Sequence, residues 1–270
     1  MKGSKVVIAT FILGATLYSP QVSAKSFSDI SELKIKSSLL VQINAKDAET
    51  YVNRGFDLYN SGDLKGAIEE FNQAIRINPN LPEAYYNRAL ARYNLGDLKG
   101  AIEDLNQVLR INPTDVMAYI NRGVARKDSG DLKGAIEDYG RAIRINPNSA
   151  DAYYSRGIAR SNLGDVKGAT EDYGRAIRIN PDYADAHYNR GVIRYRSGDL
   201  KGAIEDYNQA IRINPNYAVA YNNRGASRFL LGDKRGGITD LKKAADLFKQ
   251  QGKMAEYQKI LSLIKKIDNR

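Results

Sequence analysis

The chain has 270 residues, contains no cysteine and carries a formal net charge of +10. Without cysteine it forms no disulfide and takes no lipoprotein-type lipid, so packing alone must hold the fold. About half of the charge excess is local, because residues 242–270 hold eight Lys or Arg against three Asp or Glu.

The first 24 residues differ from the rest of the chain. Lys2 and Lys5 precede an apolar run over residues 6–17, and Val22-Ser23-Ala24 forms a small-residue cleavage pattern. These features predict a secretory signal peptide over residues 1–24, with a retained N-terminal anchor as the alternative. The apolar run is shorter than a comfortable membrane span. We therefore expect export to the periplasm or the extracellular space, or to the thylakoid lumen if the source is photosynthetic.

Residues 25–47 form a linker or cap ahead of the repeats. Residues 25–31 are mostly polar, and apolar side chains then recur at helical spacing. They predict a helix that covers the open end of the first repeat, through Ile30, Leu33, Leu39, Leu40 and Ile43.

From residue 48 onward the chain repeats every 34 residues. The marker is an Ile-Asn-Pro ending, which occurs at Pro79, Pro113, Pro147, Pro181 and Pro215. A period in this range is typical of stacked supersecondary units. When this proline is numbered position 32, six units result, over residues 48–81, 82–115, 116–149, 150–183, 184–217 and 218–251.

Each unit predicts two helices joined by a tight turn. Positions 8, 20 and 27 are small and positions 4 and 24 are large, as unit three shows with Gly123, Ala135, Ala142, Tyr119 and Tyr139. These spacings fit helices and not strands. A Gly-Asp pair in mid-unit ends the first helix with glycine and caps the second with aspartate, and Asn-Pro ends the second helix.

The repeated pattern resembles the tetratricopeptide repeat, a 34-residue helix–turn–helix. The resemblance implies an all-α solenoid, wound as a right-handed superhelix and closed by a C-terminal capping helix. The chain departs from the family pattern with arginine at position 7 throughout, arginine at position 11 in five units, and His187 at position 4 of unit five. Unit six lacks the proline and has Gly237 in place of alanine, which is expected near the end of an array.

Residues 252–270 predict the capping helix. Gly252 breaks the chain, and Met254, Tyr257, Leu261 and Ile264 then recur at helical spacing. The basic excess at this end has two interpretations: a solvated outer face of the cap, or a patch for a membrane surface, a polyanion or an acidic partner. Because the tract lacks alternating basic and aromatic residues, no nucleic-acid partner is expected.

Motifs for catalysis are absent from the sequence. The Glu-Asp pair of four units, such as Glu137-Asp138, invites an acid–base interpretation, but helix neighbours point about 100° apart. We instead expect exposed ion pairs with the equally periodic arginines at position 7, worth about 0–1 kcal/mol each. A lone His187 cannot form a metal cluster, and no phosphate loop, zinc spacing or nucleophile elbow occurs. We therefore expect no enzyme activity, no cofactor and no metal.

In the family, positions 2, 5, 6, 9, 12 and 13 of the first helices line a concave groove. Here position 6 is asparagine in five units and Ser155 in the other. An amide offers a donor and an acceptor, so the row resembles the asparagine ladder with which some family members hold an extended backbone. The predicted groove residues are Asn53, Asn87, Asn121, Asn189, Asn223, Phe56, Tyr59, Tyr86, Tyr93, Tyr154, Tyr188 and Tyr195. The alternative is that this asparagine reflects only the repeated sequence and contacts solvent.

The predicted function is that of an exported scaffold or assembly factor, which binds an extended or helical protein segment with apolar anchors in the groove. The family's clamp for chaperone tails needs lysine at position 5 and asparagine at position 9 of one unit. Unit one has Val52 and Phe56 there, and no later unit supplies the pair. Two alternatives stay open: a membrane-surface or polyanion-binding protein led by residues 242–270, and a non-catalytic subunit of an enzyme complex.

Overall fold

The computed structural model describes residues 23–268, in which thirteen α-helices follow one another and no strand occurs. The expected signal peptide lies outside this range except for its last two residues, so its cleavage stays a prediction. The helices are α1 Ser23–Ser61, α2 Leu64–Ile77, α3 Pro82–Asn94, α4 Leu98–Ile111, α5 Val116–Asp128, α6 Leu132–Ile145, α7 Ala150–Leu163, α8 Val166–Ile179, α9 Ala184–Arg196, α10 Leu200–Ile213, α11 Ala218–Leu230, α12 Lys234–Gln250 and α13 Met254–Asp268.

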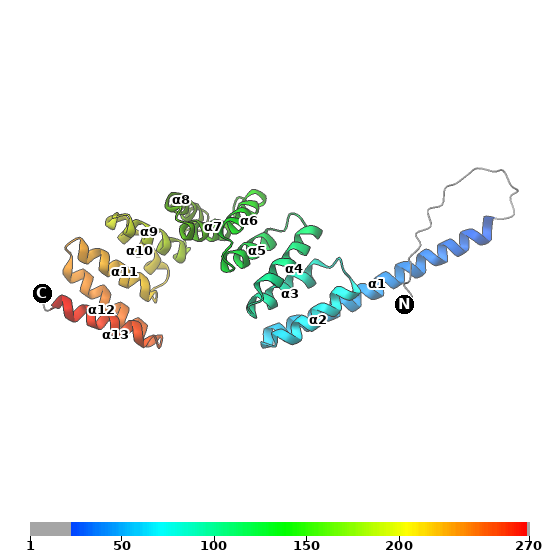
Figure 1. The fold of residues 1–270 in the computed structure, drawn as a ribbon, viewed down its shortest axis with the longest axis horizontal. Helices are drawn as coiled ribbons and strands as arrows, with labels where there is room; N and C mark the ends of the chain where they lie inside the picture. Colours follow the sequence, from blue (N-terminus) through cyan, green and yellow to red (C-terminus); the bar gives the residue numbers. More distant parts are fainter. Residues whose placement is uncertain (1–22, 269–270) are drawn as a thin grey trace.

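The helices form consecutive pairs that follow one another along an arch (Figure 1). Each unit from the second to the sixth holds one pair, from α3 with α4 to α11 with α12, and unit one holds the end of α1 with α2. Each pair packs mainly against the pairs before and after it, and α13 packs on α12. The predicted all-α repeat solenoid with a C-terminal capping helix is therefore confirmed.

Local chemistry at the turn separates the two helices of a unit. In unit three Gly130 has a φ of +92°, a left-handed conformation that glycine adopts without steric cost. The next residue, Asp131, caps α6, because its carboxylate accepts a hydrogen bond from the backbone N–H of Gly134 at 2.9 Å. The helix then ends at Ile145, directly before Asn146-Pro147. The Gly-Asp and Asn-Pro signals thus mark the helix ends as predicted.

Small residues let the two helices of a unit approach closely. Ala135 on α6 is fully buried. A Cβ atom added to Gly123 on α5 would lie 2.7 Å from Cε1 of Tyr139, whose ring fills the neighbouring space. The same relation between position 8 and position 24 holds for Gly55 with Phe71, Gly157 with Tyr173 and Gly191 with Tyr207. In this chain, every unit with an aromatic residue at position 24 therefore has glycine at position 8, which leaves space for the ring.

An ion-pair network at positions 7, 11 and 23 joins the first helix of a unit to the second. In unit three, Arg122 donates to both carboxylate oxygens of Asp138 at 2.5 and 2.9 Å, and Arg126 donates to one of them at 2.9 Å. The network recurs in units two to six through Asp104, Asp138, Asp172, Asp206 and Asp240, all buried.

The expectation of exposed ion pairs is wrong for these aspartates. Asp138 is 2% exposed, whereas the preceding Glu137 is exposed. The reason is geometric: position 23 lies three residues after position 20 and four before position 27, so it shares their helix face against the first helix. The aspartates are therefore buried groups that join the two helices of a unit, and they are not solvent-exposed surface residues.

His187 replaces the large residue at position 4 of unit five and lies buried beside this network. Its Nε2 lies 3.0 Å from the carbonyl oxygen of Pro181, and its Nδ1 lies 3.7 Å from a carboxylate oxygen of Asp206. Burial by itself would raise the pKa of Asp206, but its contacts with His187 and Arg190 outweigh burial and hold the pKa below its ordinary value. The charged carboxylate is thus the stable form in the fold.

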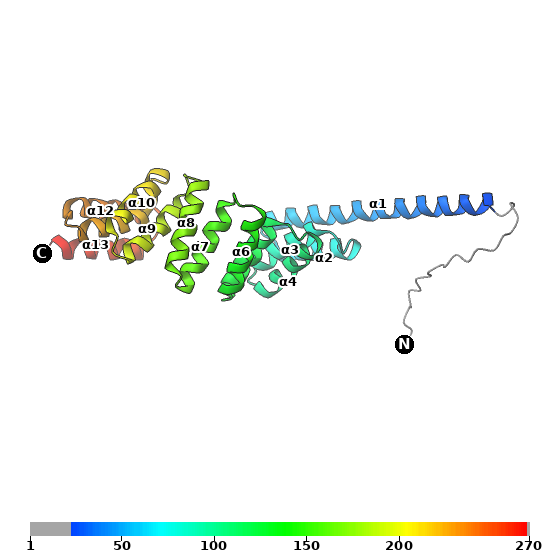
Figure 2. The ribbon, with the colours of Figure 1, turned by 90° about the horizontal axis from the view of Figure 1, so that it is seen from above.

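The N-terminal segment differs from the expected cap. Residues 23–47 continue the first helix of unit one, so α1 runs for 39 residues without a break. Figure 2 shows α1 leaving the stack as one straight helix instead of turning back over unit one. The physical reason is that no Gly or Pro, the strongest helix breakers, occurs between Pro20 and Gly55.

Within residues 23–268, every helix lacks the combination of length and apolar character that membrane crossing requires.

The capping helix α13 packs with a face slightly different from the predicted one. Ile260 and Ile264 are buried in a cluster with Leu247 and Phe248 of α12. Met254 and Leu261, which share the predicted spacing, are 48% and 39% exposed. The cap therefore leaves apolar side chains on its outer surface.

Candidate functional site

The candidate site is the surface along which the first helices of successive units meet; we call it the inner surface. It follows the helices α1, α3, α5, α7, α9 and α11, labelled in Figure 1, and takes in positions 2, 5, 6, 9, 12 and 13, which line the groove in the tetratricopeptide-repeat pattern. Side chains of neighbouring first helices hydrogen-bond across it, for example Asn121 of α5 to Tyr86 of α3. The repeat places equivalent residues at the same point of each helix, so these contacts form a row.

Tyr–Asn pairs link position 5 of one unit to position 6 of the next. The amide nitrogen donates to the phenol oxygen at 2.6 Å in Asn121–Tyr86, at 3.0 Å in Asn189–Tyr154 and at 3.2 Å in Asn223–Tyr188. The amides of Asn121 and Asn189 each keep a second N–H and the carbonyl oxygen for another partner, whereas the carbonyl oxygen of Asn223 already accepts a hydrogen bond from Asn222 at 3.0 Å. Three of the five predicted asparagines are therefore held in place by phenols, a contact that the sequence did not indicate.

The remaining asparagines of position 6 lie in a different setting. Asn87 follows a unit with Val52 at position 5, and valine offers no oxygen to an amide. Asn87 instead lines a hollow of about 420 Å³ with Tyr86 and Met117. Asn53 of unit one is exposed. Whether any of these amides holds a ligand stays a prediction.

A second row of contacts joins position 12 to position 13 of the next unit. Asn94 donates to the Tyr59 hydroxyl at 2.7 Å, and the Tyr93 hydroxyl donates to the Asp128 carboxylate. That hydrogen bond, followed by burial, raises the pKa of Tyr93 to about 12. Phe56 makes no such contact and is 50% exposed. The inner surface of units one to three thus carries polar side chains held in position by hydrogen bonds, next to apolar side chains such as Phe56 that are open to solvent.

Units four and five carry an aromatic cluster that extends the predicted site. The ring centroids of Tyr154 and Tyr183 lie 4.7 Å apart, and those of Tyr188 and Tyr217 lie 5.1 Å apart. Burial, with a further contribution from the Asp185 charge, raises the pKa of Tyr154 to about 12. Tyrosine occupies position 34 in these two units alone, and that signal in the repeat alignment would have identified Tyr183 and Tyr217.

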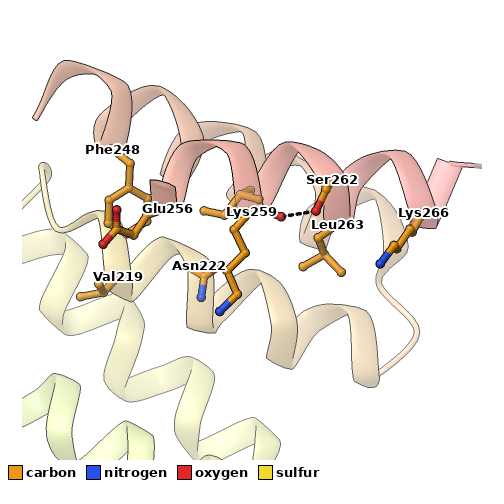
Figure 3. Close-up of a pocket in the computed structure, with 9 residues that line it drawn as sticks. Val219, Asn222, Phe248, Glu256, Lys259, Ser262, Leu263 and Lys266 are labelled. Atoms are coloured by element: carbon orange, nitrogen blue, oxygen red, sulfur yellow. Dashed lines mark hydrogen bonds between the residues drawn. The ribbon is translucent and has the colours of Figure 1, made fainter. Parts of the chain in front are cut away.

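The inner surface ends in a cleft between α11 and α13, shown in Figure 3. The cleft has a volume of about 480 Å³, and Val219, Asn222 and Phe248 line it opposite Lys259 and Leu263 of α13. In Figure 3 the Lys259 side chain extends toward Asn222, and Leu263 points into the cleft. An adjoining cavity of about 280 Å³ is lined by Tyr195, Phe229, Leu230 and Leu241 among others, and shares Leu263 with the cleft.

The groups present suit binding more than chemistry. In residues 23–268 no cluster of three or more His, Asp or Glu side chains could hold a metal ion. The buried aspartates are each neutralised by arginines, so none is placed to exchange a proton with a substrate. The inner surface offers amides, phenols and apolar side chains, which are the groups that hold a polypeptide.

Family models match most of the repeat region. The model for the tetratricopeptide repeat matches residues 82–115, and a TPR repeat model matches residues 57–96, 125–164, 162–198 and 193–232. No curated protein matches the chain.

Several solved structures resemble the fold. The crystal structure of MamA is 30% identical, covers 61% of this chain and 96% of its own, and has a TM-score of 0.57. YrrB, described as a TPR protein with an unusual peptide-binding site, is 22% identical, covers 66% and 91% of the two chains, and has a TM-score of 0.54. PilF of Pseudomonas aeruginosa is 14% identical, covers 81% and 98%, and has a TM-score of 0.69. At these lower identities the likeness concerns the fold alone.

Proposed function

The chain belongs to the tetratricopeptide-repeat family, and from this premise we propose that it is a protein-interaction scaffold or assembly factor that holds a segment of a partner protein on its inner surface. It carries out no chemistry of its own. The observation that carries the proposal is the row of Tyr–Asn pairs, in which a phenol positions each amide; Asn121 and Asn189 keep one N–H and the carbonyl oxygen for a ligand, and Asn223 keeps one N–H.

The mechanism is static recognition by a rigid surface. An extended polypeptide presents one N–H and one carbonyl per residue, so amide side chains at a regular spacing can pair with it whatever its side chains are. The hydrogen bond from Asn189 to Tyr154 fixes the amide before binding, which lowers the entropy lost on association. Apolar side chains such as Phe56 and Tyr195 beside the row supply the contacts that anchor side chains of the segment.

The C-terminal cleft supports a second candidate function, binding led by the basic end. Lys259 and Lys266 line this cleft next to the exposed side chain of Leu263, which suits an acidic segment with apolar side chains. Under this alternative the charge of α13 would dominate affinity, and the amide row would matter little. A membrane surface or another polyanion would depend on the same charges.

Salt dependence separates the two candidates. The partner is first captured from the native compartment on the immobilised chain, and its affinity is then measured by calorimetry as ionic strength rises from about 0.1 M to about 1 M. This change shortens the Debye length from about 10 Å to about 3 Å. We expect the affinity to change little, because amide hydrogen bonds and apolar contacts are short-ranged. A steep fall in affinity would favour the α13 alternative instead.

We further propose that the chain is exported, on the basis of Lys2, Lys5 and the Val22-Ser23-Ala24 pattern. The expected result is cleavage after Ala24. Intact-mass measurement of the protein from its native host checks it directly. A chain that retains Met1 through Ala24 would contradict cleavage, and its recovery from the cytosolic fraction would contradict export.

A further inference from the structure

Position 24 distinguishes unit two from its neighbours. Units three, four and five carry a tyrosine there, buried in each case, whereas unit two carries Leu105. Position 8 of unit two also differs. It is Ala89, whereas the units with an aromatic ring at position 24 have glycine at position 8. A leucine is shorter than a tyrosine by most of the phenol ring, so unit two lacks the atoms that fill this space elsewhere.

A cavity lies beside Leu105 and Ala89 of unit two. It has a volume of about 180 Å³ and is lined by residues of α3, α4 and α5, among them the apolar side chains of Leu90, Leu105 and Val124. In unit six position 24 is also a leucine, Leu241, and it lines the cavity of about 280 Å³ described above, although position 8 of that unit is Gly225 and not alanine. Both units with leucine at position 24 therefore have a cavity beside that leucine.

The chain itself shows what fits into such a space. In unit five the Tyr207 ring lies 5.9 Å from the ring of Tyr188 at position 5. Burial raises the pKa of Tyr207, and the nearby Asn223 amide partly offsets that rise. The corresponding amide of the unit-two cavity is Asn121, which lines it. In unit five, the aromatic ring at position 24 is thus accommodated next to the ring at position 5 of the same unit and close to the amide at position 6 of the next unit.

Size and polarity agree with an aromatic or leucine side chain as the occupant. A dry cavity of about 150 Å³ lined by aliphatic and aromatic side chains binds benzene, so about 180 Å³ admits a phenyl ring. The wall is apolar, and the lining also includes the amides of Asn94 and Asn121. The Asn121 amide donates one N–H to Tyr86, so its other N–H and its carbonyl oxygen are left for the backbone of the chain that carries the ring.

We propose that the unit-two cavity, defined by Leu90, Leu105 and Val124, is the anchor site of the inner surface, and that it takes one phenylalanine or leucine side chain of the bound segment. The proposal rests on the proposed function and adds a sequence requirement to it. The amide row holds any backbone, whereas this cavity selects segments with a large apolar residue at one point.

The repeat supplies a matched variant that closes the cavity. The double change Ala89→Gly with Leu105→Tyr gives unit two the glycine–tyrosine pair that unit three has in Gly123 and Tyr139. The single change Ala89→Gly is the control, because it alters the same helix and leaves the cavity open. If the tyrosine variant does not fold, Ala89→Gly with Leu105→Phe reproduces the pair Gly55 and Phe71 of unit one and serves the same purpose.

The first measurement uses small probes and needs no partner. N-acetyl-phenylalanine amide is added to the methyl-labelled chain, with N-acetyl-serine amide as the polar comparison. We expect the methyl signals of Leu90 and Val124 to shift with the phenylalanine probe only, in the native chain and in the Ala89→Gly control. The shifts should be lost in the double variant. Absent shifts in the native chain, or shifts that persist in the double variant, would overturn the anchor site.

The second measurement uses the captured partner and separates the anchor from the proposed function. We expect the double variant to weaken partner binding while the Ala89→Gly control retains it. If the double variant binds as the native chain does, but loss of the inner-surface amides weakens binding, the anchor is wrong and the scaffold function stands. If neither change affects binding, both the anchor and the inner-surface function are wrong.

Discussion

Replacing Asp138 with alanine is expected to lower the free energy of unfolding by about 3–5 kcal/mol. The carboxylate is 2% exposed and accepts three hydrogen bonds from Arg122 and Arg126. Its removal leaves two guanidinium groups facing each other in a poorly solvated place with no anion between them. Because these arginines keep some access to water, with 15% and 25% of their side chains exposed, the lower end of the range is expected. Urea denaturation followed by circular dichroism measures the change.

Glu137→Ala is the matched control for this prediction. Glu137 precedes Asp138 on the same helix but is exposed, so its removal should change stability by no more than about 0.5 kcal/mol. In a linear stack the damage from Asp138→Ala should also spread to neighbouring units, because each unit is stabilised by its interfaces. Equal stabilities of the two variants would show that the buried network is not what joins α5 to α6.

Replacing Asn87, Asn121 and Asn189 together with alanine is expected to weaken partner binding by about one to three orders of magnitude. Each amide hydrogen bond lost is worth roughly 0.5–1.5 kcal/mol, and the three sites are separated enough to add approximately. Asn121 and Asn189 also position Tyr86 and Tyr154, so their removal frees those phenols as well. Calorimetry with the captured partner measures the loss, and an unchanged helical circular-dichroism spectrum at the temperature of the binding experiment shows that the fold survives.

The comparison variant reverses the charge of the cap, with Lys259, Lys265 and Lys266 changed to glutamate. These lysines are exposed on α13, so the fold should tolerate the change. Asn87→Ala alone should have the smallest effect of the amide changes, because Asn87 holds no phenol of the preceding unit in place. If the cap variant loses binding and the triple asparagine variant keeps it, recognition belongs to the α11–α13 cleft and not to the inner surface.

Different parts of the site were predictable to different degrees. The position of the amides on one surface followed from the 34-residue period, because equivalent residues of stacked units must lie in a row. Their pairing with phenols did not, since it depends on how far one unit is rotated against the next. The restriction of tyrosine at position 34 to units four and five is visible in the sequence, but the contacts of Tyr183 and Tyr217 with Tyr154 and Tyr188 depend on how the units stack.

The C-terminal cap shows the same division. Its existence followed from the apolar spacing after Gly252. Its contact face followed only in part: the predicted Tyr257 and Ile264 pack against the α12 cluster, whereas the predicted Met254 and Leu261 are exposed. Ile260 and Ile264 then meet Phe248, and Leu261 and Leu263 remain exposed. Because apolar side chains lie at Ile260, Leu261, Leu263 and Ile264, spacing alone does not resolve which of them face α12.

The sequence by itself determined the helices and their order, because the signals for these are local. Gly130 and Asp131 end one helix and begin the next through contacts within a few residues, and Asn146-Pro147 ends that helix in the same way. Only the tertiary structure decided that Asp138 is buried between two arginines, that Asn121 meets a phenol, and that Leu105 leaves a cavity. These features join residues 12 to 35 positions apart, so they depend on how closely whole helices pack and on which side chains fill the space between them.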